Sequence, residues 1–239
     1  MANETLTQGP VTPQPACRER WRQGADLPTG YWYRPRWEVG GLPNDYAARM
    51  LRVDQPIKTE RLVLRPLRPD DLDAVNAFDS LPEVARYLYF DARDRDESRV
   101  NLERMIEQRA ITKPGDRMSL AVELAATGDL IGDVILEWSA SEHLQGEIGY
   151  VLHPDHHGRG YATEAGRELL RMGFDLLGLH RIIARCDARN GASARVMERL
   201  GMRREGHLVE NEFIKGEWTD ELVYAMLEQE WRSRAPAGD

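Results

Sequence analysis

The stretch Glu147–Ala165 reads EIGYVLHPDHHGRGYATEA and combines a strand, a tight turn and the start of a helix. The segment Glu147–Leu152 is bounded by His153-Pro154, which predicts a short strand. Gly158 and Gly160 follow in a turn, where glycine lets backbone amides approach a ligand without interference from a Cβ atom. The first free N–H groups of a helix after such a turn point at an anion. The stretch therefore predicts a phosphate or pyrophosphate site, although an ordinary glycine-rich corner fits it equally well.

Three known motifs do not fit this turn. A dinucleotide fingerprint GxGxxG, counted from Gly158, requires Gly or Ala where this sequence has Thr163. A Walker A loop requires GK followed by Ser or Thr after four residues, and no segment matches it. The pair His156-His157 lacks the Asp-Gly that completes an HHxxxDG motif. All three motifs are excluded.

Strand-like and helix-like segments extend outward from this stretch. Strands are expected at 61–67, 119–124, 130–139, 147–152, 181–187, 202–214 and 219–228, and helices from Pro69, at 94–111, from the glycine turn to about Leu177, and at 191–200. Gly128-Asp129 predicts a hairpin turn between two of the strands. This order predicts an α+β (mixed α/β) fold, with one sheet and helices on both of its faces.

Length and composition limit the class of protein. The chain has 239 residues, of which 41% are hydrophobic and 30% charged, so it can form a globular core and is not fibrous or wholly disordered. It contains no run of 18 apolar residues, and its N-terminus lacks the features of a signal peptide, so we expect a cytoplasmic protein without membrane association. Cys17 and Cys186 are too few for a disulfide framework.

Charge is distributed unevenly along the chain. The net charge of −8 is the sum of +1 over residues 1–55, −8 over 56–155, +5 over 156–204 and −6 over 205–239. The overall acidity argues against nucleic-acid binding. The one strongly basic block contains the glycine turn, as an anion site requires, although a solvated helix face is the alternative explanation.

The first 55 residues differ from the rest of the chain. Residues 1–16 contain three prolines and little to bury, so we expect them to be disordered. Residues 17–55 carry large aromatic side chains, which predicts packing on the main domain or on a second subunit; these are Trp21, Tyr31, Trp32, Tyr33, Trp37 and Tyr46. We therefore expect an N-terminal extension, 1–55, and one domain, 56–239.

The motifs taken in order resemble the GNAT superfamily of acyl-CoA-dependent N-acetyltransferases, and within it the RimJ/RimL-type branch. The CoA motif [QR]-x-x-G-x-[GA] is represented by 157–162, with His157 in the first position, and continues as GYATEA. Residues 190–202 match N-x-x-S-x-x-V-x-E-x-x-G-F with Met202 in place of Phe. The terminal W-x-D-x-x-x-Y is represented by Trp218, Asp220 and Tyr224. The resemblance covers about residues 57–231.

This resemblance implies a mostly antiparallel sheet that splays between strands 147–152 and 181–187, where CoA would lie. Backbone groups of Val151 and Leu152 would pair with the pantetheine amides. Asn190 would bind the pantetheine arm, or act as a helix N-cap, and Ser193 would lie near the sulfur, or pack as a small residue. The pyrophosphate would be held by His157, Gly158, Arg159, Gly160, Tyr161, Ala162 and Thr163. Acetyl-CoA would be the cosubstrate, with no metal.

The chemistry implied by the resemblance needs a base, an oxyanion donor and a proton for the leaving thiolate. Met197 stands where many members carry an acidic tyrosine, so Ser193 is the candidate proton donor. The N–H of Val151 is the candidate oxyanion donor. Glu147 is the candidate base through a water molecule, or a surface acid that only orients its neighbours. Glu164 is interpreted as a structural acid in the first turn of its helix.

The predicted activity is direct transfer of an acetyl group from acetyl-CoA to a primary amine. The acceptor would be a protein N-terminal α-amine or a small cationic amine, which the acidic blocks at 56–155 and 205–239 would attract. Two alternatives stay open: a non-catalytic acyl-CoA-binding regulatory or scaffold module, and an antibiotic- or metabolite-modifying acetyltransferase. The chain would act as a monomer or a homodimer.

Overall fold

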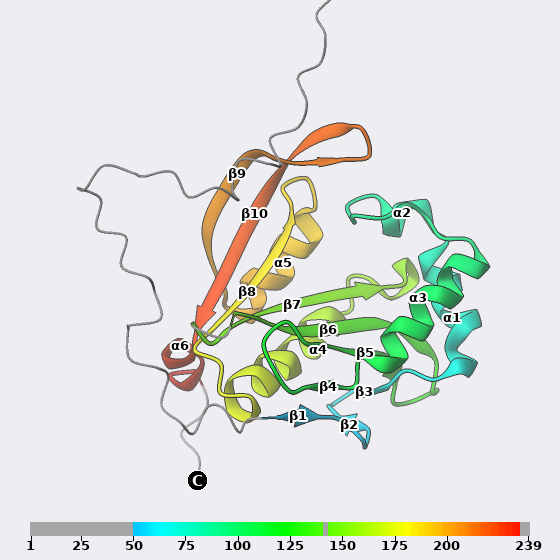
Figure 1. Ribbon diagram of the computed structural model, residues 1–239, viewed down its shortest axis with the longest axis horizontal. Coiled ribbons are helices and arrows are strands. Elements are labelled where there is room, and N and C mark those ends of the chain that lie inside the picture. Colours follow the sequence, from blue (N-terminus) through cyan, green and yellow to red (C-terminus); the bar gives the residue numbers. More distant parts are fainter. Residues whose placement is uncertain (1–49, 141–142, 235–239) are drawn as a thin grey trace, which may run out of the picture. The chain divides into compact units, whose positions relative to one another are not determined.

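The computed structural model describes residues 50–140 and 143–234 (Figure 1). The chain divides into two units, Met1–Gly40 and Gly41–Asp239, and every element below belongs to the second. The predicted disorder of residues 1–16 and the predicted packing of the aromatic side chains lie outside the described residues. Within the described ranges, no helix combines the length and apolar character needed to cross a membrane.

The elements follow one another in the predicted order, with several short additions. The strands are β1 (Leu51–Arg52), β2 (Ile57–Lys58), β3 (Leu62–Pro66), β4 (Ala110–Ile111), β5 (Arg117–Leu124), β6 (Leu130–Ala140), β7 (Gln145–Leu152), β8 (Arg181–Asp187), β9 (Arg203–Ile214) and β10 (Glu217–Leu227). The helices are η3 (Pro69–Asp71), α1 (Leu72–Asp79), α2 (Pro82–Ala85), α3 (Arg95–Glu107), η4 (Pro154–His156), α4 (Tyr161–Arg171), the π-helical η5 (Met172–Leu176), α5 (Gly191–Leu200) and α6 (Glu228–Arg232).

Eight of the described strands form one sheet in the order β2-β3-β5-β6-β7-β8-β10-β9. Neighbouring strands in this sheet are antiparallel, except β7 and β8, which run parallel to each other. The predicted mixed α/β fold with a mostly antiparallel sheet is therefore confirmed. The unpredicted elements β1, β2, β4, α2 and α6 have two to five residues, too few for a periodic pattern to be recognised.

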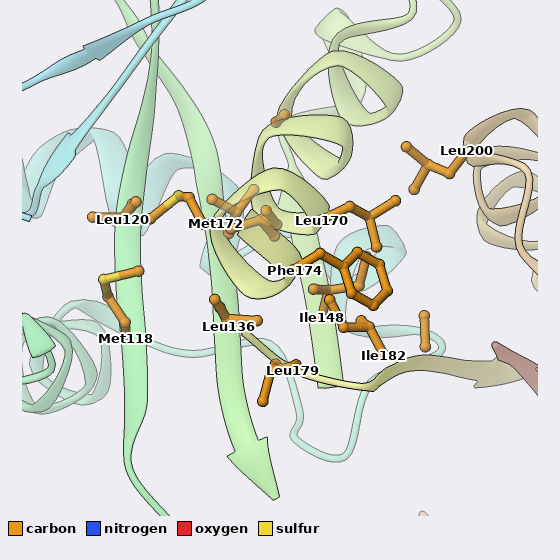
Figure 2. Packing of buried hydrophobic residues seen from close by; sticks show 14 of the residues in the cluster. Met118, Leu120, Leu136, Ile148, Leu170, Met172, Phe174, Leu179, Ile182 and Leu200 are labelled. Atoms are coloured by element: carbon orange, nitrogen blue, oxygen red, sulfur yellow. The ribbon is translucent and has the colours of Figure 1, made fainter. Parts of the chain in front are cut away.

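One face of the sheet packs against α4, η5 and α5. Ile148 of β7, Leu170 of α4 and Phe174 of η5 are buried in the same apolar cluster (Figure 2). Each such side chain contributes about 1.5–3 kcal/mol by leaving water. Leu51 and Val53, which the sequence places in the extension, are buried in this cluster as well. The core of the domain thus includes residues on both sides of the predicted boundary at residue 56.

The opposite face packs against α1 and α3. The smaller apolar cluster there contains Val75 and Phe78 of α1 together with Leu102 and Met105 of α3. Asp94 begins α3 by accepting bonds from the N–H groups of the first turn, as an N-cap residue does. Helices consequently cover both faces, as predicted.

Arg65 of β3 departs from the expected pattern. The alternation of apolar and charged residues at 61–67 predicts a half-buried strand, in which charged side chains are usually exposed. The Arg65 side chain is instead buried, between Asp71 of η3 and Glu123 of β5. Its guanidinium donates to both carboxylate oxygens of Asp71, at 2.7 and 2.8 Å, and pairs with Glu123. Such a buried charge is tolerated only when it is paired and hydrogen-bonded.

Candidate functional site

The sheet opens between β7 and β8. The two strands pair only from Gln145 to Glu147, opposite Arg181 to Ile183, and then diverge (Figure 1). Beyond this point β7 continues along β6, and β8 continues along β10. The separated edges can accept an extended ligand, which would pair with them as an added strand does.

The ladder between β6 and β7 determines which backbone groups face the opening. The N–H of His153 donates to the carbonyl of Ile131 at 2.8 Å, and register places Val151 opposite Asp133. Hydrogen-bonded and non-hydrogen-bonded pairs alternate along an antiparallel ladder, so the backbone of Val151 also bonds across to β6. The N–H of Val151, predicted as the oxyanion donor, consequently points away from the opening.

The alternate residues of β7 turn their backbone groups toward β8; they are Ile148, Tyr150 and Leu152. Leu152 thus has the direction predicted for pairing with pantetheine. Its carbonyl lies 2.9 Å from Nε2 of His157, which places that imidazole against the end of β7. The amide of Tyr150 lies on the same edge and is a candidate oxyanion donor in place of that of Val151.

The glycine turn leads directly into α4. Gly158 and Gly160 have φ values of 74° and 83°, in the left-handed region that favours glycine. The first bond of the helix runs from the N–H of Glu164 to the carbonyl of Gly160, at 3.0 Å. The amides of Tyr161, Ala162 and Thr163 therefore precede the helical ladder, and the helix dipole adds partial positive charge to them.

The groups around this turn fit a pyrophosphate. Within the described part of the chain, Oγ1 of Thr163 and Nδ1 of His156 are buried polar atoms without a hydrogen-bond partner. Arg159 is exposed. A buried polar group without a partner is costly, so an anion that supplied one would be bound favourably. These observations agree with the predicted pyrophosphate role of the turn.

Asn190 caps α5 on the other side of the opening. Its Oδ1 accepts a hydrogen bond from the N–H of Ser193 at 3.0 Å, which confirms the N-cap role foreseen for this residue. The Nδ2 group takes no part in that bond. The cap fixes the first turn of α5 and, with it, the half-buried side chain of Ser193.

Ser193 contacts a second hydroxyl group, that of Tyr150. The Tyr150 hydroxyl donates to the carbonyl of Ser193 at 3.1 Å and lies 2.9 Å from its Oγ, where either group can donate. Met197, at the position of the missing tyrosine, is fully buried in the core. The pattern of β7 gave no signal for Tyr150, because a tyrosine in a strand is usually a packing residue.

Burial keeps the Tyr150 hydroxyl and the Cys186 thiol, both close to Ser193, protonated. It raises the pKa of Tyr150 above its ordinary value, although the contact with Ser193 opposes this effect. Burial likewise raises the pKa of the Cys186 thiol to about 11. A neutral thiol is a poor nucleophile, which supports direct transfer over a covalent enzyme intermediate. Cys186 is partly buried and packs against the apolar core.

Charged side chains gather beside the opening on the other face of the sheet, away from α4 and α5. Glu147 of β7 accepts two bonds from Arg185 of β8, at 3.1 and 3.2 Å, and Arg185 also contacts Glu221 of β10 at 3.3 Å. Burial would lower the pKa of the Arg185 guanidinium, but Glu147 and Glu221 outweigh it and raise that pKa. The predicted base Glu147 is therefore part of an ion-pair network.

Glu221 is the buried member of this network. It also accepts hydrogen bonds from the hydroxyl of Tyr89 at 3.4 Å and from Nδ2 of Asn211 at 3.1 Å. Burial raises the pKa of Glu221, and Arg185 opposes the rise. Sequence reasoning missed this residue, since its contacts come from three segments distant in the sequence.

Comparison with known families and structures agrees with this geometry. A family model described as an acetyltransferase (GNAT) domain matches residues 61–203, a span that includes the opening, the glycine turn and Ser193. The chain belongs to the GNAT acetyltransferase family. It is therefore an acetyltransferase, and GNAT acetyltransferases use acetyl-CoA.

Named GNAT relatives resemble most of the chain. An uncharacterized N-acetyltransferase, YnaD, of Bacillus subtilis is 34% identical over 73% of this chain and 98% of its own length. The crystal structure of a GNAT acetyltransferase from Bacillus anthracis, also 34% identical, covers 73% of this chain and 99% of its own, with a TM-score of 0.66. Spermidine N-acetyltransferase from Vibrio cholerae, crystallised with CoA and spermine, is 26% identical over 73% of this chain and 99% of its own, with a TM-score of 0.62.

The GNAT domain thus presents two different sides at its opening. Toward α4 and α5 lie the glycine turn, Asn190 and the hydroxyl pair of Ser193 and Tyr150. Toward the other face lie Glu147, Arg185 and Glu221. Donor groups for an anionic ligand are therefore separated from carboxylates that suit a cation.

Proposed function

We propose that this protein transfers the acetyl group of acetyl-CoA directly to a primary amine of a small cationic acceptor. The observation that carries the proposal is the divergence of β7 and β8 after Glu147 and Ile183, with Ser193 beside the opening and the glycine turn at its end. A thioester that extended through the opening would have its sulfur and carbonyl between the two sides of the sheet.

In this proposal, CoA binds along the side of α4 and α5. The pyrophosphate is held by Arg159 and by the loop amides from Gly158 to Thr163. Pantetheine pairs with the edge of β7 at Leu152 and contacts Asn190. The direction of the β7 backbone groups and the unpartnered Oγ1 of Thr163 support this placement.

Acetyl-CoA supplies an activated acyl group. The neutral amine attacks the thioester carbonyl, the C–N bond forms, and the C–S bond breaks when the tetrahedral intermediate collapses. The N–H of Tyr150 stabilises the oxyanion, and Ser193 donates a hydrogen bond and then a proton to the leaving thiolate. Glu147 receives the proton lost by the amine, through a water molecule. Solvent then returns a proton to Ser193 and takes the proton from Glu147, so that the products are an acetamide and free CoA and both side chains regain their starting state.

Two observations support a cationic acceptor. Glu147 and Glu221 share the single guanidinium of Arg185, so this group of three carries excess negative charge. The Vibrio cholerae relative was crystallised with the polyamine spermine. The motifs at 157–162 and 190–202 further support placement in the RimJ/RimL-type branch, which makes a protein N-terminal amine the alternative acceptor.

The proposal is tested by measuring thiol release from acetyl-CoA with a panel of amines. The panel contains spermine, an aminoglycoside, a peptide with a free N-terminus and the same peptide with a blocked one. We expect turnover with the cationic small amines and little with the peptides. Turnover confined to the free peptide would replace the small-amine proposal. Tight CoA binding without consumption of any amine would favour the non-catalytic binding module.

A further inference from the structure

Arg61, just before β3, contacts the glycine turn from a distant part of the chain. Its Nη1 donates to the carbonyl of Arg159 at 3.0 Å. Its guanidinium carbon lies 4.8 Å from the centre of the Tyr161 ring, within the range of a cation–π contact. A Cβ atom on Gly160 would lie 3.5 Å from Nη2 of Arg61. The guanidinium therefore adjoins three consecutive residues of the turn.

The same arginine is joined to the first turn of α4 through Glu164. The Nε and Nη2 atoms of Arg61 lie 2.8 Å from Oε2 of Glu164, and its backbone N–H donates to Oε1 at 2.7 Å. The hydroxyl of Thr59 adds a bond of 2.6 Å to Oε1. Glu164, predicted to be a structural acid at a position where the helix dipole favours negative charge, thus connects α4 to the segment just before β3.

These bonds also set the charge of Glu164. Burial would raise the pKa of Glu164, but the Thr59 hydroxyl and the Arg61 amide and guanidinium outweigh burial and lower it. The carboxylate is consequently ionised at neutral pH and the ion pair is complete. Because 44% of the Arg61 side chain is exposed, the pair is worth little as a stability device on its own. Its geometry has a more specific consequence.

That consequence concerns the peptide between Arg159 and Gly160. A trans peptide is planar, with its C=O and N–H directed to opposite sides, and the described residues contain no cis peptide bond. When Arg61 holds the carbonyl of Arg159, the N–H of Gly160 is directed away from Arg61. This is one of the amides assigned above to the pyrophosphate.

We propose that Arg61 is a positioning residue for the donor substrate. It holds the Arg159–Gly160 peptide with its N–H toward the CoA diphosphate, and Glu164 and Thr59 hold Arg61 in place. The role rests on the proposed binding of CoA at this turn. It predicts an effect on the affinity for donors that contain a diphosphate, and little effect on the chemistry at the thioester.

The test compares two acetyl donors in Arg61→Gln, Arg61→Lys and wild-type protein. Acetyl-CoA contains the diphosphate, whereas S-acetylpantetheine ends before it. For Arg61→Gln we expect the KM of acetyl-CoA to rise about tenfold, with kcat within about twofold, because one oriented charged hydrogen bond is lost. The kcat/KM for S-acetylpantetheine should stay unchanged. Arg61→Lys should recover part of the affinity, since it keeps the charge but loses the fork of donors.

A matched control is Arg171→Gln, which removes an arginine paired with Glu168 at the far end of the same helix. It should leave the KM of acetyl-CoA unchanged. Glu164→Gln should reproduce the effect of Arg61→Gln, and the double variant should be no worse than either, since the two residues act together. If Arg61→Gln does not fold, Arg61→Lys and Glu164→Gln carry the comparison.

Two results would overturn the inference. One is an unchanged KM for acetyl-CoA in both Arg61→Gln and Glu164→Gln. The other is an equal loss with acetyl-CoA and S-acetylpantetheine, which would indicate general damage to the domain. Failure of the proposed function is distinguishable, because wild-type protein would then fail to bind CoA, or would bind it and consume no amine.

Discussion

The hydroxyl of Tyr150 on β7 lies 2.9 Å from that of Ser193 on α5, across the place where the sheet opens. The second bond of Tyr150, to the Ser193 carbonyl, fixes the first turn of α5 relative to β7. Two neutral hydroxyl groups are thereby placed side by side where the proposed reaction needs a donor for a leaving thiolate. Met197, which stands where many GNAT members carry a tyrosine, is buried in the core. Protonation of the thiolate is therefore left to other residues.

Removal of the Tyr150 hydroxyl should slow turnover. In Tyr150→Phe, Oγ of Ser193 loses the partner that orients it, so we expect kcat to fall about tenfold with the KM of acetyl-CoA within about twofold. The control is Tyr224→Phe, which loses a bond of 3.1 Å to Glu198. Both variants should lose about 1 kcal/mol of stability in thermal melts, but only the first should lose kcat. Full kcat in Tyr150→Phe would remove its role.

Asn190 should show two separable roles. Asn190→Ala loses the cap of α5 and should lower the free energy of unfolding by about 1 kcal/mol. Asn190→Asp keeps an oxygen acceptor for the Ser193 N–H and should retain that stability. It lacks the amide donor proposed for pantetheine, so its KM for acetyl-CoA should still rise. An unchanged KM in a stable Asn190→Asp protein would limit Asn190 to capping.

Gly160 should be needed for donor binding beyond its effect on stability. Alanine at φ 83° costs about 1–2 kcal/mol and displaces the first amides of α4. Gly128→Ala is a suitable control, because Gly128 has a similar φ of 79° and no atom would crowd its Cβ, but it lies in the β5–β6 turn. Both variants should melt at lower temperature, and only Gly160→Ala should raise the KM of acetyl-CoA. Equal KM values in the two variants would contradict the assignment of this turn.

Glu147 should affect turnover if it accepts the proton of the amine. In Glu147→Gln we expect kcat to fall at least about a hundredfold, because the amide that replaces the carboxylate cannot accept the proton. Glu137 is directly opposite Glu147 on β6 and pairs with Arg117 at 2.6 Å, so Glu137→Gln is a matched control. Similar small losses in the two variants would identify Glu147 as a partner of Arg185 only.

Asp133 should make the stability of the domain depend on pH. Burial raises the pKa of Asp133 from 3.8 to about 7, Asp79 adds to the rise, and Arg93 and Arg104 oppose it. Asp133 therefore stays protonated to a higher pH in the folded state than in the unfolded state. The free energy of unfolding consequently falls as pH rises from about 4 to about 7, by up to ~4 kcal/mol.

Asp133→Asn should remove this dependence and unfold at a higher urea concentration than wild-type protein at pH 8. Asp129→Asn, at an exposed position in the β5–β6 turn, should keep the wild-type slope. The measurement is urea unfolding of the three proteins at several values between pH 5 and pH 8. Identical slopes for Asp133→Asn and wild-type protein would show that this carboxylate is not the cause.

Much of the fold was predictable because its signals are local. The strand 181–187 and the helix 191–200 have the predicted bounds, since the one shows apolar residues at every second position and the other begins after Asn190 and ends at Gly201. The left-handed conformations of Gly158 and Gly160 likewise follow from the only residue type that adopts them without strain. The resemblance to the GNAT superfamily predicted which segments surround the opening.

Contacts between distant segments were not predictable. Glu147, Arg185 and Glu221 come from three strands, and Arg61 meets Glu164 from 103 positions away. Arg65 is buried where it meets Asp71 of η3 and Glu123 of β5, two carboxylates from other segments. The periodicity of one segment does not indicate which side chain of a distant segment will face it in the folded protein.

The sequence by itself determined the elements, their order and the glycine turn, because propensity, capping and backbone freedom depend on neighbouring residues. Only the tertiary structure decided which groups of those elements face the opening. The register of β6 against β7 directs the backbone of Val151 into the ladder and that of Tyr150 toward β8. The packing of α5 then brings Ser193 to the Tyr150 hydroxyl. Register and packing are properties of paired segments, and they are established only when the chain folds.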